Sequence, residues 1–293
     1  MAMVMAAGAI FARGFFSSPI VQHALELGAA AAIVCAVVGC FTVSRGQSFA
    51  GHALGDIGSS GGSGAYLVGL APLWGFVAIS LAAAAAMELI GVQRARARDV
   101  ATGVVLGAGF GLAALLLYLA STTASATNAA QTVLFGSIFT VGGDELPPSL
   151  ALAGSALALI AAVYRPLWLS SLSPDLAAAR GVRVRLIGVL YLAAVALAVA
   201  LAAITIGAIL ATALLVGPAA TATALARGPG RTLGIAVALA VLAAWLGILL
   251  AYDSYYWPPL HHGWPVSFFV VALVVSFNLG GRLLAGWTAA RRR

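Results

Sequence analysis

The sequence contains no lysine, and all 15 of its basic residues are arginine. A Walker A nucleotide-binding loop requires a lysine that reaches the phosphates, and Schiff-base catalysis requires a lysine amine. Both functions are therefore excluded. If ATP drives this protein, a separate subunit has to bind and hydrolyse it.

Charge of either sign is scarce. Only 8% of the residues are charged and 62% are hydrophobic, whereas about 25% of a soluble domain is charged. With a mean hydropathy of +1.07, the composition predicts an all-α polytopic membrane protein. At about 20 residues per span, the chain has room for about eight or nine transmembrane helices and little else.

Cysteine is also rare, and both cysteines, Cys35 and Cys40, lie in one apolar run. Residues five apart on a helix point to different faces, so we expect no disulfide between them. We interpret both as small buried hydrophobic side chains.

Apolar runs between prolines and arginines predict the membrane domain, residues 19–284. The expected spans are 20–43, 48–70, 72–90, 100–120, 148–169, two within 186–226, 232–251 and 265–284. The double run should turn near residues 205–207, and Pro218 implies a kink or break. The apolar run 129–142 is too short to cross the bilayer, so we expect it to form a re-entrant segment.

The arginines predict the orientation of these spans. If the loop at Arg45 is cytoplasmic, alternation places every arginine except Arg13 on the cytoplasmic side, as the positive-inside rule requires. This explains the net positive charge without a nucleic-acid partner. Residues 1–18 are expected to be an interfacial segment and 285–293 a basic cytoplasmic tail.

Two ionisable residues, His52 and Asp56, lie within the glycine-rich second span. Such groups are costly in a membrane unless they are paired or functional, and four residues apart they share a helix face. Imidazole and carboxylate suit zinc, manganese or iron(II). The alternative is a hydrogen-bonded pair that holds two helices together.

Other histidines and acids form weaker metal candidates. His23 and Glu26 are three residues apart near a helix end, where they could also be ordinary interfacial residues. A later loop contains Asp253, His261 and His262. Adjacent histidines bind one ion only if the loop is irregular.

Glycines at a spacing of four residues predict close helix packing. Gly58 and Gly62 have this spacing in the second span, and Gly103, Gly107 and Gly111 have it in the fourth.

The pattern Gly58-Ser59-Ser60-Gly61 matches the nucleophile motif of rhomboid-type intramembrane proteases. We keep a serine protease with Ser60 as nucleophile as an alternative, although a base histidine deep in another helix is missing.

The segment 173–181 predicts a short, well-capped helix. It has Ser173 at the N-cap, Pro174 and Asp175 in the first turn, Arg180 in the last turn and Gly181 after it, each in its preferred place. It is far too short to cross a bilayer. We expect a cytoplasmic element that docks a partner.

Four stretches resemble, in order, motifs of the integral membrane permeases of zinc/manganese-type ABC metal importers. They are Gly51-His52-Ala53-Leu54-Gly55-Asp56, Leu134-Phe135-Gly136-Ser137-Ile138-Phe139-Thr140-Val141, Pro174-Asp175-Leu176-Ala177-Ala178-Ala179-Arg180-Gly181-Val182 and Leu214-Leu215-Val216-Gly217-Pro218-Ala219-Ala220-Thr221-Ala222. The resemblance covers most of residues 17–284.

The resemblance implies a type II importer-like transport subunit rather than an enzyme, with no tightly bound cofactor. It would carry a divalent metal ion, pair with a second copy and receive the ion from an extracytoplasmic solute-binding protein. A cytoplasmic ATPase pair would dock at 173–185, through Pro174, Asp175, Arg180 and Gly181. His52 and Asp56 occupy the family's ligand positions in exchanged order, and the loop histidines are not part of its pattern. A permease for a larger metal chelate, siderophore or corrinoid therefore stays open.

Overall fold

Helices joined by short loops make up the part of the chain that the computed structural model describes, namely residues 15, 18–89, 95–123, 129–136, 138–226, 228–257 and 263–290. Its longer helices are α2 (Pro19–Ser44), α3 (Ser48–Leu67), α4 (Pro72–Leu89), α5 (Ala95–Thr123), α7 (Leu146–Leu172), α9 (Val184–Ile206), α10 (Ala208–Leu225), α11 (Pro229–Ser254) and α12 (Val266–Ala290). The shorter ones are α6 (Ala129–Phe135), η2 (Gly143–Glu145) and α8 (Pro174–Ala179).

Within the described residues, seven helices are long and apolar enough to cross a membrane, and α4 is an apolar helix of slightly shorter length. The polytopic all-α fold is thus confirmed, and the predicted spans agree with the observed helices to within a few residues at most ends. Because the glycines and serines of α3 lower its hydropathy, α3 is not among the seven. The total of nine spans stays a prediction.

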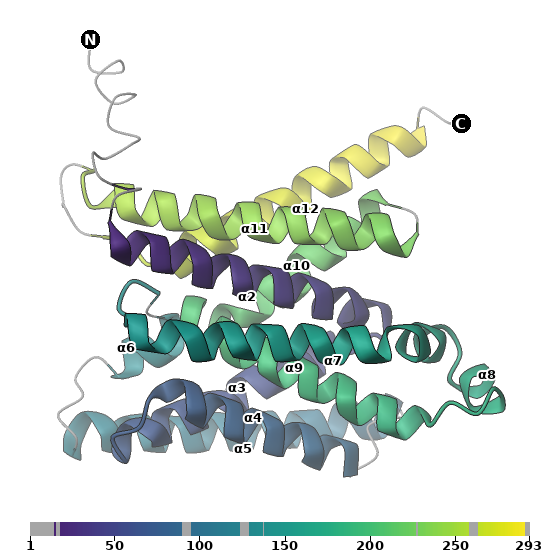
Figure 1. Ribbon diagram of the computed structural model, residues 1–293, viewed down its shortest axis with the longest axis horizontal. Helices are drawn as coiled ribbons and strands as arrows, with labels where there is room; N and C mark the ends of the chain where they lie inside the picture. Colours follow the sequence, from purple (N-terminus) through teal and green to yellow (C-terminus); the bar gives the residue numbers. More distant parts are fainter. Residues whose placement is uncertain are drawn as a thin grey trace.

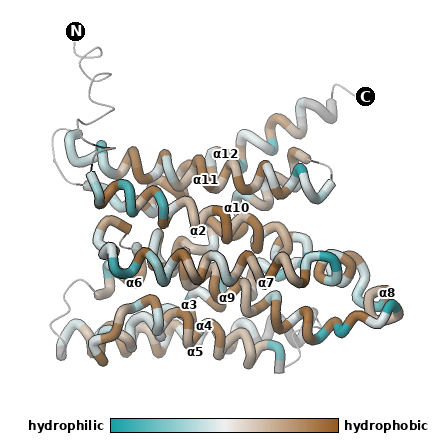
Figure 2. The backbone as a smooth tube through the Cα atoms, viewed as in Figure 1, coloured by the Kyte–Doolittle hydropathy of each residue, from teal (hydrophilic) through white to brown (hydrophobic). Residues whose placement is uncertain are grey.

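The helices lie in layers along the long axis of the molecule. Figure 1 shows α11, α12 and α2 on one side, α7 and α9 in the middle and α4 with α5 on the other side, while α8 projects at one end. The central helix is α9, whose residues from Tyr191 to Ile206 are nearly all buried, and α2, α3, α4, α7 and α10 pack against it. Hydrophobic residues dominate every layer (Figure 2).

The helix is interrupted at Gly207, between α9 and α10, as predicted. A φ of 92° at this residue requires glycine. No helix end occurs at Pro218, since α10 continues through it to Leu225. The short α6 ends against this break. A Cβ on Gly136 would overlap the backbone of the α9–α10 break, and a Cβ on Gly207 would overlap the backbone at the end of α6. The contact between the two segments therefore requires glycine at both positions.

Close packing of α3 depends on its glycines. Gly58 and Gly62 contact side chains of α4, which confirms the predicted packing face, and a Cβ on Gly61 or Gly75 would overlap the carbonyl of the other. The same prediction is wrong for Gly103, Gly107 and Gly111, because no described atom lies within 4 Å of a Cβ built on any of them. Their spacing is right, but that face of α5 is uncovered in this chain.

We predict that Gly61→Ala and Gly75→Ala each lower the free energy of unfolding by about 1–3 kcal/mol, because the added methyl group forces α3 and α4 apart. Gly103→Ala is the matched control, with open space at its Cβ. The measurement is the thermal unfolding midpoint of the detergent-solubilised protein, followed by tryptophan fluorescence. Equal midpoints for Gly61→Ala and Gly103→Ala would contradict the packing account.

Candidate functional site

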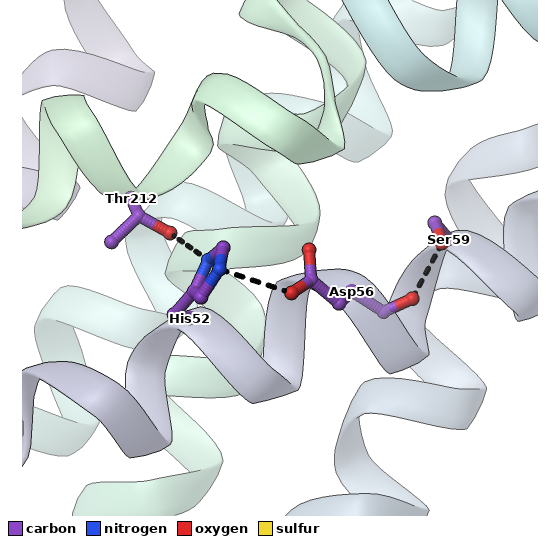
Figure 3. A network of polar contacts seen from close by, with 4 residues as sticks. All are labelled: His52, Asp56, Ser59 and Thr212. Atoms are coloured by element: carbon purple, nitrogen blue, oxygen red, sulfur yellow. Dashed lines mark hydrogen bonds and ion pairs between the residues drawn. The ribbon is translucent and has the colours of Figure 1, made fainter. Parts of the chain in front are cut away.

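His52 and Asp56 face each other along α3. The Nε2 atom of His52 lies 3.3 Å from Oδ2 of Asp56, and the two side chains are 35% and 1% exposed. Oδ1 of Asp56 is buried and has no hydrogen-bond partner. Figure 3 shows both side chains on the same face of the helix. A carboxylate with an unused oxygen inside an apolar bundle is ready to accept a cation.

Thr212 of α10 fixes the other side of the histidine. Its Oγ1 lies 2.9 Å from Nδ1 of His52, so the ring is held with Nε2 toward Asp56 (Figure 3). The sequence analysis missed Thr212, whose only signal is a hydroxyl within an apolar run. The alternative interpretation is that the His52–Asp56 pair holds two helices together. His52 and Asp56 belong to one helix, and the link between helices is the contact of His52 with Thr212.

The weaker metal candidates are dispersed. His23 is half-buried and Glu26 exposed on α2. Asp253 is buried at the end of α11, where its Oδ2 accepts a hydrogen bond from Nε1 of Trp257 at 3.0 Å. His261 and His262 lie outside the described residues. Across the described ranges, no group of three or more His, Cys, Asp or Glu residues could hold a metal ion.

The two cysteines behave as predicted. Cys35 and Cys40 are buried and free, and Cys35 Sγ lies 3.6 Å from the carbonyl oxygen of Ala198. They serve as apolar packing residues of α2.

The short helix α8 has the predicted caps, but it ends at Ala179, so Arg180 is its C-cap and not part of its last turn. Oγ of Ser173 accepts a hydrogen bond from the Leu176 N–H, and Gly181 has a φ of 79°. The N–H groups of Gly181 and Val182 donate to Ala178 and Ala177, which completes a Schellman motif. These local bonds hold α8 as a rigid projection. Its exposed residues include Pro174, Asp175, Leu176 and Arg180.

Arg45 anchors α2 beside this projection. Its guanidinium donates to the hydroxyl oxygens of Ser170 and Ser171 at 3.0 and 3.3 Å, in the last turn before α8. It also lies over the ring of Tyr191 of α9, 5.1 Å from the centroid. Burial lowers the pKa of Arg45, and electrostatic interactions with Tyr191 and Glu88 oppose that shift. Arg45 therefore connects α2, α7 and α9.

Long apolar helices around a broken α9–α10 pair, with an ionisable pair inside, define a polytopic membrane protein with a buried polar site. Residues 17–276 match the model of the ABC 3 transport family. The chain belongs to this family, and it is a multi-pass protein of the plasma membrane. The resemblance to ABC metal importer permeases is thereby confirmed, and the intramembrane protease alternative is discarded.

Individual relatives agree with this assignment. The chain is 27% identical over 243 residues to the manganese transport system membrane protein MntC of Listeria innocua, covering 83% of this chain and 85% of that protein. It is 30% identical over 228 residues to MntC of Halalkalibacterium halodurans, covering 78% and 77%. The solved structure of PsaBC from Streptococcus pneumoniae in complex with Fab has a TM-score of 0.79, 25% identity and 92% coverage of both chains.

Replacing Arg45 with methionine should lower the free energy of unfolding by about 1–3 kcal/mol, because buried polar groups around the guanidinium lose their partner. Arg45→Lys should recover only part of this, since an ammonium cannot reproduce the fork of donors. Arg165→Met, at an exposed position of α7, is the control. The check is the thermal midpoint in detergent, and a midpoint for Arg45→Met within error of the control would contradict the anchor.

Proposed function

We propose that this chain is the permease of an ABC importer that carries a divalent metal ion into the cytoplasm, and that the ion binds His52 and Asp56 in transit. The observation that carries the proposal is the buried Asp56 carboxylate, whose Oδ1 has no partner and whose Oδ2 faces Nε2 of His52. A permeating cation bound between these atoms satisfies both.

Among the divalent metal ions, we propose manganese as the cargo. Two relatives are named as manganese transport proteins, and one imidazole with one carboxylate suits Mn²⁺ as well as Zn²⁺ or Fe²⁺. Two protein ligands leave the remaining positions to water. This favours transient binding over a closed structural site, because conduction requires that an ion also leaves.

Thr212 has a supporting role in this proposal. A ligating histidine normally uses its second ring nitrogen in a hydrogen bond that fixes the tautomer and the orientation of the ring. Thr212 Oγ1, at 2.9 Å from Nδ1, supplies that bond and leaves Nε2 for the ion.

The proposed assembly contains two copies of this chain, a pair of cytoplasmic ATPase subunits and an extracytoplasmic solute-binding protein. The ATPase docks on the segment 173–185. This is supported by the exposure of α8 and by its position beyond the helix layers (Figure 1). Leu176 is an apolar side chain that is 48% exposed there, and contact with a partner would cover it.

Asp56→Asn and His52→Ala should abolish uptake of radiolabelled Mn²⁺ by the assembled importer without changing the amount of assembled protein. Asparagine keeps the shape of Asp56 but removes the charge that attracts the ion. Thr212→Val should weaken the apparent affinity about 10–100-fold, as loss of a supporting hydrogen bond does at metal sites. Thr223→Val, exposed on the same helix, is the control. Unchanged uptake of Mn²⁺, Zn²⁺ and Fe²⁺ by Asp56→Asn would refute the proposed site.

Leu176→Glu should prevent co-purification of the ATPase subunit, because a charge replaces the apolar side chain at the proposed contact. The matched control is Val68→Glu, which alters an exposed apolar residue in the turn between α3 and α4. Retention of the ATPase by Leu176→Glu, with its hydrolysis still stimulated, would show that α8 is not the docking element.

A further inference from the structure

The polar residues of α3 continue beyond the His52–Asp56 pair on one face. Ser59, Ser63 and Tyr66 follow Asp56 at steps of three, four and three residues, so all lie on the same side of the helix. Ser59 and Ser63 are 1% and 0% exposed. Figure 3 shows Ser59 one turn beyond Asp56. We call the pair Ser59 and Ser63 the serine ladder.

Each hydroxyl of the serine ladder uses its proton within the helix. Ser59 Oγ donates to the carbonyl oxygen of Asp56 at 2.5 Å, and Ser63 Oγ donates to that of Ser59 at 2.6 Å. With the proton engaged, the lone pairs of each oxygen remain available as acceptors. Oxygen ligands of this kind suit hard divalent cations such as Mn²⁺.

A cavity lies beyond the ladder, and Tyr66 rather than Ser59 or Ser63 forms part of its wall. Tyr66 lines a cavity of about 110 Å³ together with Thr132 of α6, Thr140 and Glu145. The arginine pattern predicts that this end of α3 is extracytoplasmic. A carboxylate and several hydroxyls at its wall make the cavity a suitable reservoir for a hydrated cation.

The helix α6 stands between this cavity and a larger one. Thr132 and Thr140 also line a cavity of about 290 Å³, whose wall includes Gln131, Gly136 and Thr205. The same helix packs against α3, α9 and α10. The α6 helix therefore contributes to the walls of both cavities and contacts the helix that carries the ladder.

We propose that the serine ladder is the ion path between the cavity at Tyr66 and the His52–Asp56 site. The ion passes from the oxygen of Ser63 to that of Ser59 and then to the unpartnered Oδ1 of Asp56. This inference rests on the proposed function, and it adds two ligands and a direction of approach. It also assigns a chemical role to hydroxyl groups that close helix packing alone does not require, since alanine would pack equally well.

The first test measures access. Ser59→Cys and Ser63→Cys are prepared in the importer assembled with its ATPase, and a small cationic methanethiosulfonate reagent is added from the extracytoplasmic side. We expect modification of both cysteines during ATP turnover and a several-fold slower reaction in the presence of Mn²⁺. The control is Ser155→Cys, because Ser155 makes the same type of intrahelical bond on the exposed surface of α7 and a thiol facing lipid does not ionise. The buried Cys35 and Cys40 should also stay unmodified.

The second test removes the oxygens. The double variant Ser59→Ala, Ser63→Ala should lose Mn²⁺ uptake several-fold at an unchanged amount of assembled importer, while Ser155→Ala should match the unaltered protein. Wild-type uptake by the double variant, or the absence of modification at Ser63→Cys in every state, would overturn the inference. The two proposals can fail separately. Uptake by Asp56→Asn tests the ion site of the proposed function. Modification of Ser63→Cys tests whether the path is accessible, whatever ion the importer carries.

Discussion

The arrangement of the site depends on the cost of holding a carboxylate inside an apolar helix bundle. Asp56 is 1% exposed, and one of its oxygens has no protein partner. Water would satisfy that oxygen at a protein surface, but in a membrane the protein or its cargo has to do so. The neighbouring His52, its fixation by Thr212 and the hydroxyls further along α3 form a polar strip within otherwise hydrophobic surroundings. The glycines of the same helix let α4 and α10 close over it.

The fold and the short helix α8 could be predicted because their signals are local. Pro19 and Pro72 each begin a helix, and the predicted first and third spans begin at or directly after these residues. The ends of α8 agree with the predicted caps because each cap is a bond between residues a few positions apart. Local chemistry of this kind is specified by the sequence itself.

The contacts that complete the site could not be predicted, because they join distant segments. Thr212 lies 160 residues from His52, and no pattern in a single sequence pairs them. Spacing also misled at Gly103, Gly107 and Gly111, since a glycine stripe does not reveal whether another helix covers it. Asp253 is a candidate ligand by residue type, and the sequence could not reveal that its Oδ2 accepts a hydrogen bond from Trp257 while its buried Oδ1 has no partner. A residue type limits what a side chain can do, and its neighbours decide what it does.

The mutual contact of Gly61 and Gly75 has a mechanical consequence. With no side chains between them, the backbones of α3 and α4 touch directly, and so close a contact leaves little room for one helix to move without the other. The two helices therefore form a single lever. Any rotation of α3 that alters access to its polar face has to carry α4 with it, and the opposite end of α4 lies beside α9, where Glu88 approaches Gly188. A movement of α9 at this end would therefore reach α3 through α4.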